Sequence, residues 1–137
     1  MTAKEYLLQV SKINERLPVM AERLKRLRSA AEYISPQLDS TKTTTRNVHA
    51  MESAVIRIVE LEELIHAEYE RLADASATVG KLTEPKHEKI LMLRYFDNKK
   101  WVNIADDLQL SERQVRRIHE EAVEALEAVL KIDRLPP

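Results

Sequence analysis

The chain has 137 residues, and its 22 basic and 23 acidic side chains leave a formal net charge of −1 at pH 7. This balance argues against a coat that binds nucleic acid regardless of sequence, so a DNA reader must gather its positive charge on one face. The absence of cysteine excludes disulfides and thiolate metal sites, and the single glycine excludes a glycine-rich phosphate loop. Few glycines and aromatics beside many Ala, Glu, Leu, Lys and Arg residues predict an all-helical fold.

Nothing in the composition or spacing suggests catalysis. The four histidines are too far apart to form a metal-ligand motif: His49, His66, His87 and His119. The N-terminal segment MTAKEYLLQV lacks the apolar run of a signal peptide, and no stretch reaches the length of a membrane span. We therefore expect a cytoplasmic protein that is not an enzyme and that has no metal, cofactor or membrane partner.

The first expected helix carries an apolar stripe over residues 10–34. Spacings of three and four alternate through Val10, Ile13, Leu17, Met20, Leu24, Leu27, Ala31 and Ile34. This pattern predicts a helix packed lengthwise against another helix. Pro18 removes one backbone hydrogen bond, so we expect a kink or break between Asn14 and Leu17. The helix should end at Ser35–Pro36, because the residue before proline avoids the helical region.

A Ser- and Thr-rich segment over residues 36–46 predicts a loop before a second helix. The second apolar stripe consists of Ala54, Ile58, Leu61, Ile65, Leu72, Ala75 and Val79. Val55, Leu64 and Tyr69 are expected to widen it, and Glu68 interrupts it. Gly80 is expected to end this helix as a C-terminal cap. Two segments of about 30 residues joined by one loop predict an antiparallel helical hairpin over residues 1–80. Because two helices bury little core, the hairpin is expected to dimerise or bind a partner, with a plain scaffold as the alternative.

Residues 81–137 have the spacing of three shorter helices. Thr83 is a suitable N-cap, Glu84 and Pro85 suit a first turn, and Asp97-Asn98 punctuates the apolar run that ends at Phe96. A helix over Trp101–Leu108 follows, then a turn at Gln109-Leu110-Ser111 and a helix from Glu112 to about Leu130. The expected inward-facing residues are Ile90, Leu91, Leu93, Phe96, Val102 (or Trp101), Ile104, Ala105, Leu108, Val115, Ile118, Ala122, Val123, Leu126 and Val129. Two helices joined by about three residues behind a support helix predict a helix-turn-helix.

The start of the last helix concentrates the residues that a major groove would meet. The expected exposed positions are Glu112, Arg113, Gln114, Arg116 and Arg117, followed by His119, while the acidic residues lie further along the helix. Arginine contacts guanine with two hydrogen bonds and glutamine pairs with adenine, and Lys99 and Lys100 are placed to hold phosphates. Ser111 and Gln114 also fit a capping box, so Gln114 either reads a base or folds back onto the backbone.

Residues 90–126, ILMLRYFDNKKWVNIADDLQLSERQVRRIHEEAVEAL, resemble region 4 of the sigma-70 family. They also resemble the C-terminal domain of small phage and mobile-element regulators of the ArpU and RinA type. The resemblance implies that Ser111 caps the recognition helix and that the exposed residues 112–117 face double-stranded DNA. The sequence departs from the family pattern at two positions. Lys100 stands where the family often has a Ser or Thr cap, and Gln109 stands where a turn glycine is common. A left-handed Gln costs about 1 kcal/mol more than Gly.

The resemblance implies a transcription regulator of phage or mobile-element genes, acting as an activator and contacting RNA polymerase. Residues 1–82 do not resemble the promoter-melting region, so an autonomous sigma factor is not expected. Two alternatives stay open. One is a protein-interaction module that binds RNA polymerase or a sigma factor without reading DNA, and the other is a DNA-packaging recognition subunit. A homodimer through the hairpin would read two half-sites about 34 Å apart.

Overall fold

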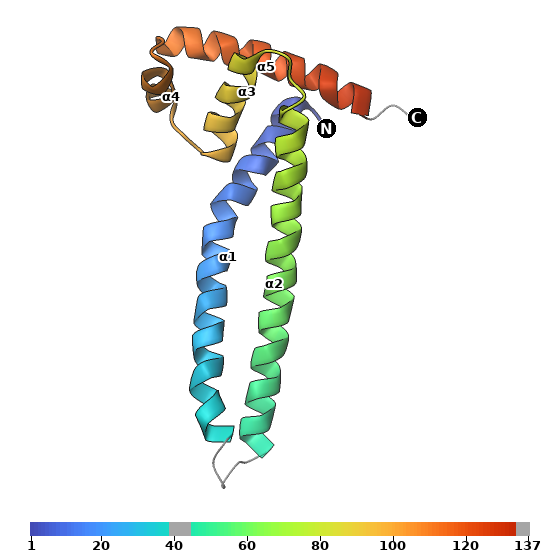
Figure 1. Ribbon diagram of the computed structural model, residues 1–137, viewed down its shortest axis with the longest axis vertical. Coiled ribbons are helices and arrows are strands. Elements are labelled where there is room, and N and C mark those ends of the chain that lie inside the picture. Colours follow the sequence, from blue (N-terminus) through green and yellow to red (C-terminus); the bar gives the residue numbers. More distant parts are fainter. Residues whose placement is uncertain (39–44, 134–137) are drawn as a thin grey trace. The chain divides into compact units, whose positions relative to one another are not determined.

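The computed structural model describes residues 1–38 and 45–133, with the backbone alone for 35–38, and every element in these ranges is helical (Figure 1). In chain order the elements are α1 (Ala3–Leu38), α2 (Thr45–Val79), α3 (Pro85–Leu91), the π-helix η1 (Met92–Phe96), α4 (Trp101–Leu108) and α5 (Glu112–Asp133). The prediction of an all-helical protein is therefore confirmed. None of the described helices is both long and apolar enough to cross a membrane.

The chain forms two compact units that share the long helices α1 and α2. The first unit combines Met1–Glu15 with Glu70–Pro137, and the second unit is Arg16–Tyr69. The structural boundary thus runs through both long helices, whereas the sequence pattern placed a boundary at residue 80. The functional division into residues 1–80 and 81–137 stays a prediction.

The first unit has two apolar clusters. The larger cluster draws on α1, α2, α3, η1 and α5 and consists of Ala3, Leu7, Val79, Leu82, Leu91, Tyr95, Ala122, Leu126 and Leu130. The smaller cluster packs α4 against α3 and α5 through Ile90, Ile104, Ala105 and Val115. The inward face of α4 includes Trp101 and not Val102, which is 51% exposed, so of the two expected alternatives Trp101 is the correct one.

The first turn of α1 belongs to this unit because it is bonded to α5. Thr2 and Glu5 form a capping box, in which the Glu5 N–H donates to Thr2 Oγ1 at 3.2 Å and the Thr2 N–H donates to Glu5 Oε2 at 3.1 Å. The Ala3 N–H donates to Glu127 Oε2 at 2.6 Å. A carboxylate at a helix N-terminus is favourable, since the unpaired N–H groups carry partial positive charge there.

The second unit contains segments of α1 and α2 that run side by side in opposite directions (Figure 1). Arg16 pairs with Glu68 at 3.3 Å and Arg28 pairs with Glu62 at 2.6 Å. Later residues of α1 therefore lie beside earlier residues of α2, as in an antiparallel pair. The seam residues Leu17, Ala31 and Leu61 are buried. The expected widening of the stripe is wrong, because Val55, Leu64 and Tyr69 are 45%, 58% and 55% exposed. Two helices alone offer no further surface to cover these flanking positions.

Three other expectations about helix ends are wrong. Helix α1 does not break at Pro18 and does not end at Ser35–Pro36, but continues to Leu38; the expected kink between Asn14 and Leu17 stays a prediction. Each proline removes only one backbone hydrogen bond, and the turns on either side keep theirs. Of the expected loop, residues 36–38 belong to α1 and 45–46 to α2, and the rest lies outside the described residues.

The third error concerns the start of α3. Its N-cap is Glu84, with extended backbone and no side-chain cap bond, and not Thr83. Pro85 explains this position because it occupies the first helical residue and keeps the preceding residue extended. Gly80 follows the last residue of α2 as expected, although it does not adopt a positive φ.

Candidate nucleic-acid interface

The turn between α4 and α5 is formed by the predicted residues Gln109, Leu110 and Ser111. Gln109 ends α4 in the left-handed conformation, with φ 56° and ψ 43°. Its N–H donates to the Asp106 carbonyl at 3.3 Å, and the Leu110 N–H donates to the Ala105 carbonyl at 3.0 Å. Leu110 packs against the smaller apolar cluster. The turn is thus held by two backbone bonds and one apolar contact, at the cost of a strained non-glycine residue.

A capping box fixes the first turn of α5. The Gln114 N–H donates to Ser111 Oγ at 3.2 Å, and the Ser111 N–H donates to Gln114 Oε1 at 3.0 Å. The cap by Ser111 is therefore confirmed. Gln114, a candidate adenine reader, has its carbonyl oxygen committed to the backbone, which is the second of its two expected roles.

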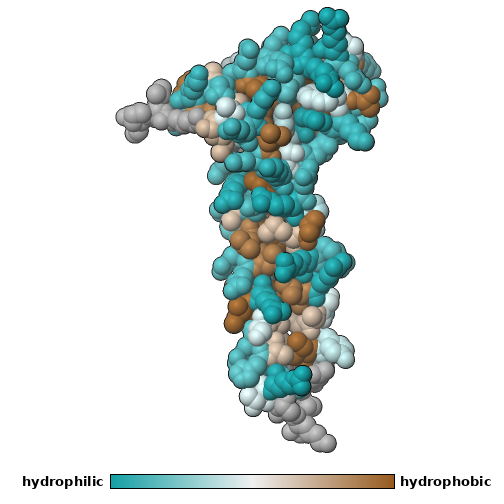
Figure 2. Space-filling model, turned by 180° about the vertical axis from the view of Figure 1, so that it is seen from behind, coloured by the Kyte–Doolittle hydropathy of each residue, from teal (hydrophilic) through white to brown (hydrophobic). Residues whose placement is uncertain are grey.

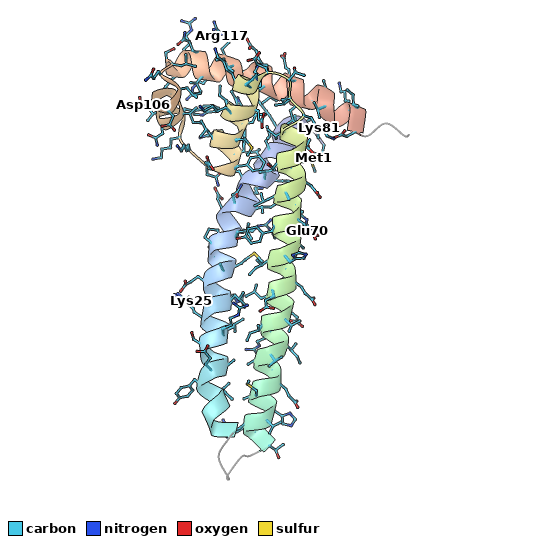
Figure 3. All side chains as sticks on the ribbon, viewed as in Figure 1. Met1, Lys25, Glu70, Lys81, Asp106 and Arg117 are labelled. Carbon is cyan, nitrogen blue, oxygen red and sulfur yellow. The ribbon has the colours of Figure 1, made fainter. Side chains whose placement is uncertain are left out.

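The exposed side of the first two turns of α5 carries the predicted polar residues. Glu112, Arg113, Gln114, Arg116 and Arg117 are all exposed, while Val115 is fully buried. Figure 3 shows Arg117 extending from the side of α5 away from α3. No ion pair joins Arg113 or Arg117 to a carboxylate within residues 1–38 and 45–133.

Two acidic residues further along α5 lie near basic groups of the first unit. Glu120 lies 3.9 Å from Lys4 Nζ, and Glu121 lies 3.5 Å from His87 Nε2. Among the described residues, Arg113 and Arg117 therefore have no carboxylate partner, whereas Glu120 has a lysine nearby. This arrangement gives the helix start the sign that a phosphate backbone attracts.

Trp101 organises two arginines next to this surface. The Arg94 guanidinium carbon lies 4.4 Å from the indole centroid and the Arg116 carbon lies 5.4 Å from it, both within the range of cation–π attraction. Arg94 also donates to the Lys99 carbonyl at 2.9 Å and so links η1 to the start of α4. Trp101 is half-buried and packs against the smaller cluster, as expected for the alternative in which it faces inward.

His119 was expected among the exposed residues, and this expectation is wrong because the side chain is only 6% exposed. It lies four residues after Val115 and three before Ala122, which places it on the buried stripe of α5. Its Nε2 is 2.7 Å from Tyr95 Oη, and its ring packs edge-on against Trp101 at 4.7 Å.

Burial sets the protonation of this buried pair. It lowers the pKa of His119, with Lys4 and Arg94 acting in the same direction and Glu120 opposing them. Burial also raises the pKa of Tyr95. At pH 7 the imidazole is therefore neutral, and Tyr95 Oη and His119 Nε2 share a hydrogen bond whose donor is set by the imidazole tautomer.

The two candidate phosphate-binding lysines differ in their surroundings. Lys99 Nζ lies 2.6 Å from Asp107 Oδ2, and this hydrogen bond raises the pKa of Lys99. Lys100 is exposed at the N-cap position of α4 and makes no side-chain cap bond. The Lys100 side chain is thus free of a cap bond, whereas Lys99 would have to give up its bond to Asp107 before it could bind a phosphate. Within the described chain no cluster of His, Asp and Glu residues could hold a metal ion.

A sequence model described as "Protein of unknown function (DUF722)" matches residues 9–128. The chain belongs to the DUF722 family. The DUF722 match includes most of α1 and α2 and the whole α4–α5 turn, so both compact units contribute to the family pattern. No curated protein and no solved structure matches the chain.

Proposed function

We propose that this DUF722 protein is a sequence-specific DNA-binding transcription regulator in which α4, the Gln109–Ser111 turn and α5 form a helix-turn-helix. Helix α5 lies in the major groove, α3 and η1 support it, and the α1–α2 hairpin serves dimerisation or partner binding. The observation that carries the proposal is the pair of exposed arginines, Arg113 and Arg117, on a capped helix start, with no carboxylate partner in the part of the chain that the structure describes. Helix starts of this kind supply base contacts in helix-turn-helix proteins.

Each residue of the surface has a role that follows from its contacts. Arg113 and Arg117 contact base edges or phosphates, and Glu112 can accept a hydrogen bond from cytosine. Arg116 is pre-ordered by Trp101, which reduces the entropy lost when it binds. Lys100 binds a phosphate at the start of α4. Ser111 and Gln114 hold the helix start in place rather than read sequence.

The phage and mobile-element context and activation rest on the resemblance of residues 90–126 to regulators of the ArpU and RinA type, and contact with RNA polymerase rests on their resemblance to sigma region 4. The exposed surface of the first unit supports a second candidate function. A groove lined by Lys86, Lys89, Ile90, Leu108, Leu110 and Ile118 has an apolar floor with two basic side chains. Such a groove suits an acidic, partly apolar segment of RNA polymerase or a sigma factor, which is the protein-interaction alternative.

Selection of bound sequences from a random pool of duplex DNA tests the proposal directly. We expect an enriched motif and an affinity that falls steeply with salt, since phosphate contacts release counterions. Replacing Arg113 and Arg117 by Ala should abolish enrichment, while Lys86→Ala with Lys89→Ala should largely preserve it. A pool that shows no enrichment, together with retention of a polymerase or sigma subunit that depends on Lys86 and Lys89, would favour the protein-interaction module.

A further inference from the structure

The second unit lacks a core of its own. Within its described residues only Leu17, Ala31 and Leu61 are buried among the apolar side chains. Met20, Leu24, Leu27 and Ile34 on α1, with Met51, Ile58 and Ile65 on α2, are only half-buried. Figure 2 shows apolar side chains reaching the surface along the long helices. A hairpin of two helices buries little apolar area, which favours a further surface that covers it.

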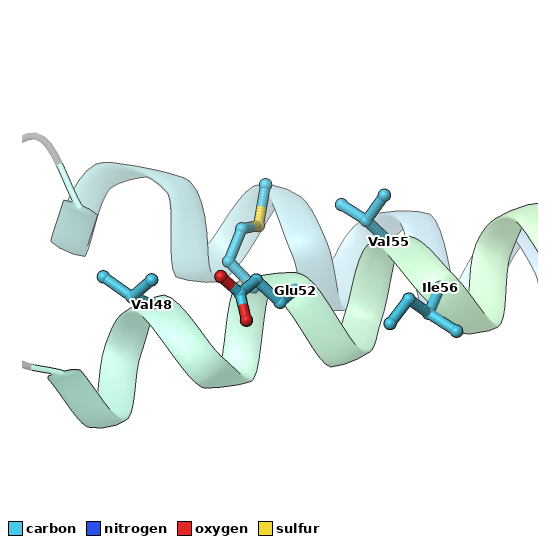
Figure 4. Close-up of a pocket in the computed structure, with 5 residues that line it drawn as sticks. Val48, Glu52, Val55 and Ile56 are labelled. Carbon is cyan, nitrogen blue, oxygen red and sulfur yellow. The ribbon is translucent and has the colours of Figure 1, made fainter.

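One exposed stripe on α2, the α2 stripe, consists of Val48, Met51, Val55 and Val59. Spacings of three and four place these residues on one face of the helix. Val48, Val55 and Val59 are 40%, 45% and 46% exposed. Val48, Met51 and Val55 line a shallow pocket with Glu52 and Ile56, and Figure 4 shows Val48 and Val55 projecting on the same side of α2.

The α2 stripe shares a face of the hairpin with a groove between the two helices. Leu24, Lys25 and Arg28 of α1 and Ile65 of α2 line this groove. Glu62 is three residues beyond Val59 and so continues the α2 stripe, and it pairs with Arg28 at 2.6 Å. This ion pair connects the stripe to the groove. Together they form one apolar face bounded by basic residues on α1 and acidic residues on α2.

The charges that border this face are complementary to those of a second copy. On α1 the groove is lined by Lys25, Arg28 and Glu32, a net charge of +1. On α2 the acidic side chains Glu52 and Glu62 border the stripe, a net charge of −2. When a two-fold axis brings identical faces together, α1 of one copy can therefore oppose the oppositely charged α2 of the other.

We propose that a second copy of this chain covers the face, so that two hairpins form a four-helix bundle with α1 of each copy packed on α2 of its partner. Two orientations of the two-fold axis are available to stacked hairpins. An axis along the helices makes every neighbour antiparallel and opposite in charge, whereas an axis across them places α1 on α1 and α2 on α2, like charge against like charge. Charge selects the axis along the helices.

This orientation has a consequence for the rest of the chain. Both crossings between the two units, 15–16 and 69–70, are at the end of the second unit where Arg16 pairs with Glu68. In the proposed dimer these ends come together, so both copies of the first unit are attached at one end of the bundle. The bundle forms without DNA and does not depend on the proposed DNA-binding function.

The mass of the full-length chain in solution tests the proposal by sedimentation equilibrium without DNA. We expect about twice the chain mass of 15.9 kDa. Val48→Glu with Val55→Glu should yield a monomer, because two carboxylates would be buried in the interface. The matched control Val19→Glu should stay dimeric, since Val19 is 69% exposed and lines a separate groove with Pro18 and Arg26. A monomeric wild-type chain, a large ring or a control as disruptive as the stripe variant would overturn the proposal.

The orientation is tested by one spin label per chain. The chain has no cysteine, so Arg46→Cys, in the first turn of α2, gives a single attachment site. The axis along the helices predicts a label-to-label distance within about 25 Å, because neighbouring helices are 8–10 Å apart. The axis across the helices moves the labels to opposite ends, separated by roughly the 37 Å that 25 helical residues span. A distance near the longer value would refute the proposed packing.

Discussion

Replacing Ser111 by Ala removes the cap that starts α5. The substitution removes the hydroxyl that accepts the Gln114 N–H at 3.2 Å and donates to Gln114 Oε1 at 3.2 Å, whereas the Ser111 backbone N–H keeps its acceptor on Gln114. Loss of a serine N-cap costs about 1 kcal/mol. For a cooperative domain of about 60–100 residues, such as the first unit, a loss of 1 kcal/mol in the free energy of unfolding lowers Tm by roughly 4–8 °C. Because Arg113 is in the same turn, we also expect weaker DNA binding.

Amide hydrogen exchange and thermal unfolding of the full-length chain measure this effect. The Gln114 amide should exchange faster in Ser111→Ala, since its acceptor is gone. Gln114→Glu should keep the wild-type Tm, because Glu is the common partner in a capping box and suits a helix N-terminus. Ser53→Ala, at an exposed position within α2, serves as the control and should not lower Tm. Unchanged exchange at Gln114 together with unchanged Tm in Ser111→Ala would refute the capping box.

Two further predictions concern the support of α5. Gln109→Gly should raise stability by up to about 1 kcal/mol in urea unfolding, because Gln109 has a φ of 56°. Asn98→Gly should give no such gain, although its φ is 53°, since Asn tolerates this conformation and the Asn98 side chain bonds to Ser11. Burial lowers the pKa of His119, so its contribution to stability is complete above its ordinary pKa of about 6.5 and falls as pH decreases toward the folded value. The decrease in Tm between about pH 7.5 and pH 5.5 should be smaller in His119→Phe than in wild type, and an equal decrease contradicts this assignment.

Local features of the candidate interface were predictable because they depend on residues close together in sequence. The turn at Gln109–Ser111, the cap by Ser111 and the buried Val115 follow from spacings of three to five residues. The burial of His119 was also within reach, because the residue falls on the apolar stripe of α5. Its polarity favoured exposure instead, because a buried imidazole needs a hydrogen-bond partner. That partner, the Tyr95 hydroxyl, lies 24 residues earlier in the chain.

Contacts between distant parts of the chain were not predictable from local patterns. The bond from the Ala3 N–H to Glu127 joins residues 124 positions apart, and it attaches the start of α1 to α5. The widened turn of η1, where the Asp97 N–H donates to the Met92 carbonyl, has no distinct apolar period. Pairing of Lys99 with Asp107 likewise depends on how the start of α4 is placed by Arg94. Tertiary packing decides the first contact, whereas the other two are local geometries that the apolar spacing does not encode.

The salt dependence of DNA affinity, measured on the selected sequence, tests the central claim most directly. Arg113→Ala with Arg117→Ala should lower affinity at every salt concentration and reduce the slope of log K against log salt by about 0.9 for each phosphate that is no longer neutralised. Where an arginine also reads a base, its removal adds a penalty of about 1–3 kcal/mol. The control Lys12→Ala with Lys131→Ala removes the same charge from exposed positions of the first unit and should change the slope little. Equal effects of the two double variants would contradict DNA reading by the start of α5.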